Sequence, residues 1–257
     1  MSKLIDGVFY SSLIGKDLPY RAIVPNGDRS TFGSTPVLYL LHGLFGSATN
    51  WTDLTRLNEY SANMDLLIVM PDGGDNWYTD GEEKYESYLI RDLLPEIERR
   101  HGASTHRCDR SIAGNSMGGY GALKIALKYP KIFGFAASFS GAFHVTRFFP
   151  GIEGGELAPS ILRVFGEKDD PTRIDNDIFN VAARALESRD ALPRIYFDCG
   201  LDDPFIDANR EFATVLAETG IEFEFLEVVG GHDWSYWDQR IAYLIQLLTK
   251  KFAVEGL

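Results

Sequence analysis

Cysteine is scarce in this sequence of 257 residues, which contains only two, Cys108 and Cys199. Both lie at or near expected strands. A chain of this length can bury a sizeable core without disulfide bonds, so we expect two free core thiols. The cysteine content therefore does not suggest a small disulfide-stapled secreted domain, and it favours a cytoplasmic protein.

Long apolar segments are missing as well. No run approaches the roughly 20 apolar residues that a membrane-spanning helix needs. Residues 1–20 lack the continuous apolar segment that is typical of a signal peptide. We therefore expect no membrane insertion, and no secretion signal is visible in the sequence.

Positive charge is in deficit, because 25 lysines and arginines face 37 aspartates and glutamates, which gives a formal net charge of −12. Such a chain repels the phosphates of nucleic acids and the headgroups of anionic membranes. We therefore expect a small-molecule substrate and no nucleic-acid partner. The composition leaves open whether the chain is a monomer or a homo-oligomer.

Apolar strand-like runs alternate with helical patterns along most of the chain. This alternation predicts a single α/β domain over residues 1–257, with a mostly parallel central sheet covered by helices on both faces. The exception is residues 142–180, which fit the alternation worst and which we interpret as a small cap-like excursion. The expected hairpin pairs 7–12 with 18–25. The other expected strands are 37–43, 64–73, 110–114, 133–141, 193–200 and 221–231, and the expected helices are 85–102, 120–130, 203–220 and 237–252.

A glycine-rich stretch, Gly114-Asn115-Ser116-Met117-Gly118, joins an expected strand to an expected helix. It matches the pattern G-x-S-x-G, in which a nucleophilic serine stands on a sharp strand-to-helix turn. Side chains at 114 and 118 would collide with the neighbouring backbone, so both positions need glycine. The turn exposes the serine hydroxyl at a helix N-terminus, where the helix dipole favours developing negative charge. We therefore expect Ser116 to be a nucleophile.

A serine hydroxyl needs a general base that a third group orients. In the order Ser-acid-His, His232 of "GGHDW" follows the last strand and fits the role of the base. His144 also follows Ser116, but it precedes the convincing acids, and we expect it to line the pocket. The remaining histidines are His42, which lies in "LLHGLFG", His101 at a helix end, and His106 in a polar loop.

The acid is expected after the strand 193–200, where "GLDDP" offers Asp202 and Asp203. A second acidic turn, "GEKDDP", offers Asp169 and Asp170 within the irregular excursion. That turn is farther from His232 in sequence, and solvated loop charge explains it most simply. The residues alone favour the pair at 202–203.

Two backbone N–H groups are also needed to stabilise an oxyanion. Met117 follows the nucleophile, and Leu44 follows "HG" after an early strand, with Phe45 as the alternative. The candidate pocket residues are aromatic or lie beside these loops. They are Phe45, Trp51, Trp77, Phe143, His144 and Trp234. We expect neither a metal nor an organic cofactor, since residues 72–83 lack the spacing of a calcium loop.

Together these stretches resemble the α/β-hydrolase superfamily and, more narrowly, the esterase D family of serine esterases. That family includes S-formylglutathione hydrolases, tributyrin esterases, feruloyl and acetyl esterases, and related mycolyltransferases. The matching stretches cover most of the chain in order: 7–25, 40–51, 70–80, 85–98, 112–130, 199–212 and 230–241. The resemblance implies Asp203 as the acid, because it occupies the G-x-x-D position, and Leu44 and Met117 as oxyanion donors.

The residues and the resemblance together lead us to expect a serine carboxylesterase with a Ser116-His232-Asp203 triad. Because the pocket-edge residues are aromatic or small, we expect it to act on short-chain acyl esters. The alternatives within enzymes are an S-formylglutathione hydrolase-like thioesterase, a feruloyl or acetyl esterase of carbohydrate esters, and an acyltransferase. A binding protein on the same scaffold is the alternative from another class. The presence of all three triad members argues against it.

Overall fold

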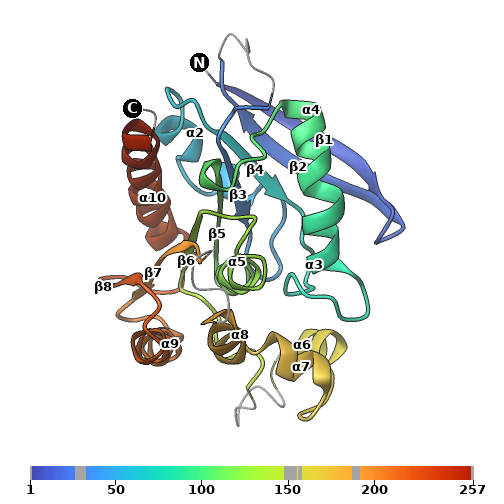
Figure 1. Ribbon diagram of the computed structural model, residues 1–257, viewed down its shortest axis with the longest axis vertical. Coiled ribbons are helices and arrows are strands. Elements are labelled where there is room, and N and C mark those ends of the chain that lie inside the picture. Colours follow the sequence, from blue (N-terminus) through green and yellow to red (C-terminus); the bar gives the residue numbers. More distant parts are fainter. Residues whose placement is uncertain (1, 27–32, 148–154, 156–157, 187–191, 256–257) are drawn as a thin grey trace.

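Figure 1 shows the computed structural model of the chain, a sheet with helices on both faces. The structure describes residues 2–26, 33–147, 155, 158–186 and 192–255. In this described part, eight strands form one sheet in the order β1-β2-β4-β3-β5-β6-β7-β8. The strands are β1 Lys3–Ser11, β2 Lys16–Val24, β3 Val37–Leu41, β4 Leu67–Pro71, β5 Arg110–Asn115, β6 Phe135–Phe139, β7 Arg194–Gly200 and β8 Phe223–Val228.

The strand directions place the working loops at one edge of the sheet. β1 and β2 form the expected antiparallel hairpin, and β2 pairs antiparallel with β4. The six strands β3 to β8 run parallel to one another. Because the carboxyl ends of parallel strands share an edge, the loops after β3, β4, β5, β7 and β8 gather there. The mostly parallel sheet and its strand order fit the predicted α/β-hydrolase fold.

Helices cover the two faces of the sheet because its strands are apolar on both sides. On β3, Tyr39 and Leu41 pack into one core with α4, α5, α8 and α9, while Leu38 and Leu40 pack into a second core with α1, α2 and α10. The helices are α1 Asn50–Asp53, α2 Leu57–Tyr60, α3 Tyr85–Tyr88, α4 Leu94–His101, α5 Met117–Lys128, α6 Ala158–Phe165, α7 Pro171–Asn176, α8 Ile178–Ala185, α9 Ile206–Thr219 and α10 Trp234–Glu255.

The helix expected at 85–102 is present but irregular. A π-helical turn, Leu89–Leu93, joins α3 to α4, just before Pro95. Proline lacks the N–H that a regular helix would use there, and the widened turn accommodates that loss. The segment ends at Gly102, which has φ 68°, as a helix-terminating glycine does.

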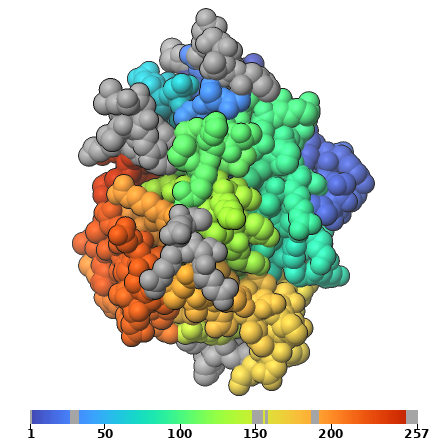
Figure 2. Space-filling view, viewed as in Figure 1, coloured from blue at the N-terminus to red at the C-terminus, as the bar shows by residue number. Residues whose placement is uncertain are grey.

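The excursion expected at 142–180 lies partly outside the described residues, at 148–154 and 156–157. Its described part contains α6 and α7 and the start of α8. In Figure 2, α6 and α7 lie against the segment that leads into α3. The approach is close, since a Cβ added at Gly81 would lie 2.4 Å from the carbonyl oxygen of Val164 in α6.

The expectation of two core thiols is half right. Cys108 and Cys199 form no disulfide, and Cys199 is buried in β7, but Cys108 is exposed. Cys108 lies in a short 3₁₀ turn, Arg107–Asp109, that precedes β5 instead of lying in the strand itself. The predicted strand begins only at Arg110, so the thiol misses the core.

Candidate active site

Ser116 stands on a strained turn between β5 and α5. Its φ of 53° and ψ of −117° lie outside the regions that ordinary side chains adopt. The turn is held by the Ser116 N–H, which donates to the carbonyl oxygen of Phe139 over 2.9 Å. A Cβ added at Gly114 would lie 2.5 Å from the backbone carbon of Gly118, and one added at Gly118 would lie 2.5 Å from the Leu41 carbonyl oxygen. The two glycines are therefore required for the turn that projects the serine.

Two loops bring a histidine and a carboxylate to this serine. His232, in the loop between β8 and α10, has Nε2 3.0 Å from Ser116 Oγ. Its Nδ1 lies 2.9 Å from Oδ2 of Asp203, which follows β7. The His232 side chain is one-quarter exposed, and that of Asp203 is fully buried. The three residues therefore form a continuous hydrogen-bonded chain from a cavity to the protein interior.

The surroundings of Asp203 keep it ionised. Burial opposes its ionisation, but the hydrogen bond and the charge of His232 and the Phe205 N–H outweigh burial and lower the pKa of the Asp203 carboxyl. The Phe205 N–H donates to Oδ1 over 2.8 Å, so Oδ2 is left for the imidazole. An ionised acceptor at Nδ1 places the imidazole proton there and leaves Nε2 free to accept a proton from the serine.

The competing acids lie elsewhere. Asp202 is exposed, and its backbone N–H donates to the carbonyl oxygen of Gly230. In the excursion, Asp169 is exposed and the Asp170 side chain accepts from the Thr172 N–H as the N-cap of α7. The second acidic turn is thus a helix start and a solvated loop.

The other histidines make separate contacts. His144 lies 2.8 Å from a carboxylate oxygen of Glu211 on α9, and His101 lies 2.8 Å from the Tyr20 hydroxyl. His42 joins two loops of the carboxyl edge, because the Gly73 N–H donates to its Nε2 over 2.9 Å and its Nδ1 lies 2.7 Å from the Gly43 carbonyl oxygen.

This histidine clamp fixes the loop that carries Leu44. Burial lowers the pKa of His42, and the Gly73 N–H requires an acceptor at Nε2, so the ring is neutral with its proton on Nδ1. The bond from Nδ1 to Gly43 then orients the following peptide. Leu44 lines the cavity beside Ser116, and Met117 is the first residue of α5, whose N–H has no partner within the helix.

A cavity of about 560 Å³ opens in front of Ser116. Five loops of the carboxyl edge form its walls. The lining residues are Gly43, Leu44, Phe45, Gly46, Asn50, Trp77, Asn115, Ser116, Pro204, Phe205, His232, Asp233, Trp234 and Trp237.

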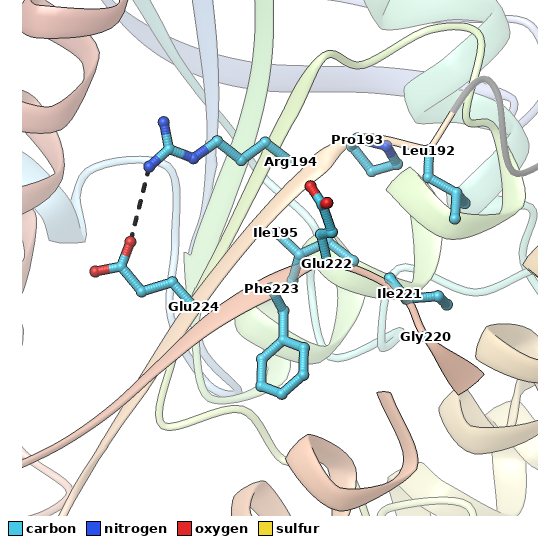
Figure 3. Close-up of a pocket in the computed structure, with 9 residues that line it drawn as sticks. All are labelled: Leu192, Pro193, Arg194, Ile195, Gly220, Ile221, Glu222, Phe223 and Glu224. Carbon is cyan, nitrogen blue, oxygen red and sulfur yellow. Dashed lines mark ion pairs between the residues drawn. The ribbon is translucent and has the colours of Figure 1, made fainter. Parts of the chain in front are cut away.

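A second cavity of about 570 Å³ lies at the start of β7 and β8 (Figure 3). Residues 192–195 and 220–224 line it, and an Arg194–Glu224 ion pair of 3.8 Å lies at one side. Its described lining contains no serine, cysteine or histidine. Since the two cavities are nearly equal in size, their chemistry distinguishes them, and the one at Ser116 holds a serine hydroxyl hydrogen-bonded to an imidazole.

Only some of the expected pocket residues line this cavity. Phe45, Trp77 and Trp234 do, and Phe45 is 73% exposed. Trp51 is a correction, because it is fully buried and its indole N–H donates to the carbonyl oxygen of Leu41.

Phe143 and His144 are also absent from the lining. Phe143 is fully buried among Phe197 and Phe212 of the core, with ring centroids 5.9 and 4.7 Å away. His144 turns toward Glu211 on α9. Both lie in the loop that follows β6, and this loop directs their side chains away from Ser116.

Two aromatic residues that we did not expect at the site hold His232. Phe205 and Trp237 each place their ring edge-on to the imidazole, with centroids 5.0 Å away. The sequence offers a signal for both, because they fall in the stretches 199–212 and 230–241 that carry the family resemblance. Their packing restricts the rotation of the imidazole that the hydrogen bonds orient.

Two kinds of feature are absent from the described residues. No group of three or more His, Cys, Asp or Glu side chains there could hold a metal ion. No helix in the described ranges combines the length and apolar character that crossing a bilayer requires.

Comparison with known proteins agrees with this geometry. A family model described as "Putative esterase" matches residues 11–246. An acetyl esterase from Caldicellulosiruptor saccharolyticus is 30% identical over 256 residues, which cover 94% of this chain and 96% of that protein.

Two solved structures from Staphylococcus aureus share the fold. The fluorophosphonate-binding serine hydrolase FphF matches with a TM-score of 0.85 and 25% identity, over 96% of this chain and 98% of that chain. An S-formylglutathione hydrolase matches with a TM-score of 0.86 and 24% identity, over the same shares. The family match, the relative of equal length and the shared sheet lead to one conclusion: the chain belongs to the esterase family of the α/β-hydrolase fold and is a serine ester hydrolase.

Proposed function

We propose that the chain is a carboxylesterase of short-chain acyl esters whose catalytic triad is Ser116, His232 and Asp203. The observation that carries this proposal is the hydrogen-bonded chain of 3.0 and 2.9 Å that ends at Ser116 in the cavity. Ser116 Oγ attacks the ester carbonyl while His232 Nε2 takes its proton, and Asp203 stabilises the imidazolium that forms.

The N–H groups of Leu44 and Met117 stabilise the tetrahedral oxyanion. His232 then gives its proton to the leaving alcohol, and water activated by the same imidazole hydrolyses the acyl-enzyme. The strained turn at Ser116 supports this role of Met117, and the His42 clamp supports that of Leu44, because each fixes a peptide before substrate binds.

Aromatic walls support a preference for acetyl to butyryl esters. Trp77, Phe205, Trp234 and Trp237 surround the nucleophile, and Trp77 and Trp237 are held by packing, with 2% and 6% of their surface exposed. Each added buried CH₂ gains only about 0.8 kcal/mol until the chain meets such a wall. The name of the Caldicellulosiruptor saccharolyticus relative, an acetyl esterase, agrees with this preference.

The test combines covalent labelling with a substrate panel. A fluorophosphonate probe should label the wild type at Ser116, and Ser116→Ala should lose labelling and about 10⁶ in kcat while remaining folded. Ser12→Ala, at an exposed serine, is the control and should keep both. Labelling at another serine would overturn the triad.

The panel decides the substrate class. We expect the highest kcat/KM on p-nitrophenyl acetate to butyrate, and a fall beyond them. Higher kcat/KM on dodecanoyl esters would refute the short-chain preference, and higher values on S-formylglutathione or methyl ferulate would assign a thioesterase or a feruloyl esterase instead.

A further inference from the structure

The wall residue Trp77 lies on a strained backbone turn. Two hydrogen bonds within the turn offset part of the strain, from the Thr79 N–H to the Asn76 carbonyl oxygen and from Thr79 Oγ1 to the Trp77 carbonyl oxygen. Trp77 and Tyr78 have φ values of 54° and 47°, so two successive residues with side chains adopt the left-handed region that glycine favours. Trp77 nevertheless lines the cavity of Ser116. Contacts from outside the turn must therefore stabilise it.

Contacts to the Trp77 side chain come from the excursion and from α5. Its indole N–H donates to Ser160 Oγ of α6 over 3.2 Å, and its ring packs on Phe165 of α6 and Tyr120 of α5. Arg163 donates to Asn76 Oδ1, just before the turn. These contacts position the ring, but none of them reaches the backbone of Tyr78.

The backbone of the turn is held by a buried lysine, Lys124. This residue belongs to α5, the helix that begins directly after Ser116, and it is fully buried. Its ammonium donates to the Tyr78 carbonyl oxygen over 2.8 Å and to Thr79 Oγ1 over 2.6 Å. Gly121, three residues earlier on the same helix face, lacks the Cβ that would lie 2.9 Å from the Cβ of Tyr78.

The remaining contacts of this ammonium join two further segments. It forms an ion pair of 3.0 Å with Glu86 of α3 and a hydrogen bond of 3.3 Å with Asn176 Oδ1 at the end of α7. A buried charge without partners would be very costly, so this set of acceptors accounts for a lysine in the core. Lys128, one turn along α5, also pairs with Glu86 and Asn176, and its ammonium is bound at this end of the network and not at the Trp77 turn.

We propose that Lys124 is a positioning residue for the wall of the catalytic cavity. It holds the Trp77–Thr79 turn in a fixed position relative to α5, the helix that begins directly after the nucleophile. The inference rests on the proposed function, because Trp77 matters only if substrate binds at Ser116. Its effect passes through substrate binding, since Lys124 touches neither the nucleophile nor the base.

The Lys124 ammonium loses its proton within the pH range in which the enzyme can be assayed. Burial lowers its pKa to about 8, against the attraction of Glu86. The ionisable groups around it are Glu86, Asp80, Lys128 and the hydroxyl group of Tyr120. The Tyr129 hydroxyl also belongs to this network, because it donates a hydrogen bond to Glu86. As pH rises through 8, the ammonium loses a proton and its ion pair, and its hold on the turn weakens.

The experiment compares Lys124→Met with Lys128→Met on p-nitrophenyl acetate at pH 7. Lys124→Met should raise KM about tenfold with kcat within about threefold, because the wall moves while the triad remains. Lys128→Met removes an ion pair to the same carboxylate and should leave both constants within about twofold. Equal effects of the two variants would overturn the proposal, because loss of the Glu86 pair alone would then explain them.

A double-mutant cycle with Trp77→Ala tests whether Lys124 affects KM through Trp77. If Lys124 acts through Trp77, the KM effects of the two single variants should not add in the double variant. Additive effects would overturn the proposal. KM of the wild type should also rise about twofold or more between pH 7 and 9, and that of Lys124→Met should stay flat; a parallel rise in both would count against it.

Two controls keep the outcomes distinct. Fluorophosphonate labelling at Ser116, measured in every variant, reports whether the triad is intact. Failure of labelling in the wild type would refute the proposed function. Normal labelling of Lys124→Met with an unchanged KM would refute only the positioning role. If Lys124→Met does not fold, Thr79→Val is the substitute. It removes one acceptor of Lys124 together with the hydrogen bond that Thr79 Oγ1 donates to the Trp77 carbonyl oxygen, so both KM and its pH dependence are measured. KM should rise and should change less between pH 7 and 9 than in the wild type, and an unchanged KM or an unchanged pH dependence would refute the proposal.

Discussion

Replacing Asp203 with asparagine is the sharpest test of how the site handles protons. The side chain keeps its shape, and the Phe205 N–H, which donates to Oδ1 over 2.8 Å, should retain the amide oxygen. The amide NH₂ then faces His232 Nδ1, 2.9 Å away, where the carboxylate oxygen was. A donor there forces the imidazole to accept at Nδ1 and to carry its proton on Nε2, toward Ser116.

The magnitude follows from this wrong tautomer. In a serine protease the same exchange costs about 10⁴ in kcat, which corresponds to about 5 kcal/mol of transition-state stabilisation. We expect Asp203→Asn to lose at least about 10³ in kcat with little change in folding. The phenolate released from p-nitrophenyl acetate between pH 6 and 9 measures the rate, and circular dichroism measures folding.

The neighbouring acids are the matched controls. Asp202 and Asp169 are exposed, so their asparagine variants should stay within about tenfold of the wild type. An inactive Asp169→Asn with an active Asp203→Asn would refute the reasoning, because the acid would then belong to the excursion and not to the loop after β7.

Two further predictions concern stability. Gly118→Ala should cost about 1–3 kcal/mol in urea unfolding, because its Cβ would press on the Leu41 carbonyl. Gly231→Ala, whose Cβ would meet no atom closer than 3.5 Å, should cost less, and the reverse order would contradict the steric argument. Burial opposes ionisation of Glu86, but Lys124 and Lys128 lower its pKa from 4.5 to about 2. Its stabilisation is thus present above pH 4.5 and lost as pH falls toward 2, so the stability gap to Glu86→Gln should narrow below pH 4.5. A gap independent of pH would contradict the pairing.

Local chemistry made much of the fold and of the candidate site predictable. Glycines at 114 and 118 around a serine predict a sharp strand-to-helix turn, because the steric conflict they avoid lies within a few residues of the turn. Continuous apolar runs such as 37–43, in which apolar and polar residues do not alternate, predict strands of a parallel sheet. The order of these strands brings the loops with Asp203 and His232 to the edge of the sheet where Ser116 lies.

Other features depended on which segments meet in space. Trp51, Phe143, Trp77 and Trp234 are all large aromatics beside working loops, yet the first two are buried in the core and the others line the cavity. Sequence spacing does not distinguish them, because the direction of a side chain in a loop depends on backbone angles such as the positive φ of Trp77.

Lys124 shows the same limit most clearly. Lysine side chains are mostly exposed in proteins, and no motif in the sequence marks this one as buried. Its burial depends on a carboxylate from α3, a carbonyl from the Trp77 turn and an amide from α7, which come together only in the folded chain. The sequence by itself determined the scaffold and the order of its chemical groups, because these follow from local sterics and burial patterns. Tertiary structure decided which polar groups share a buried position. A buried charge is stable only where pairing offsets the cost of its desolvation, and the pairing groups come from residues that are distant in the chain.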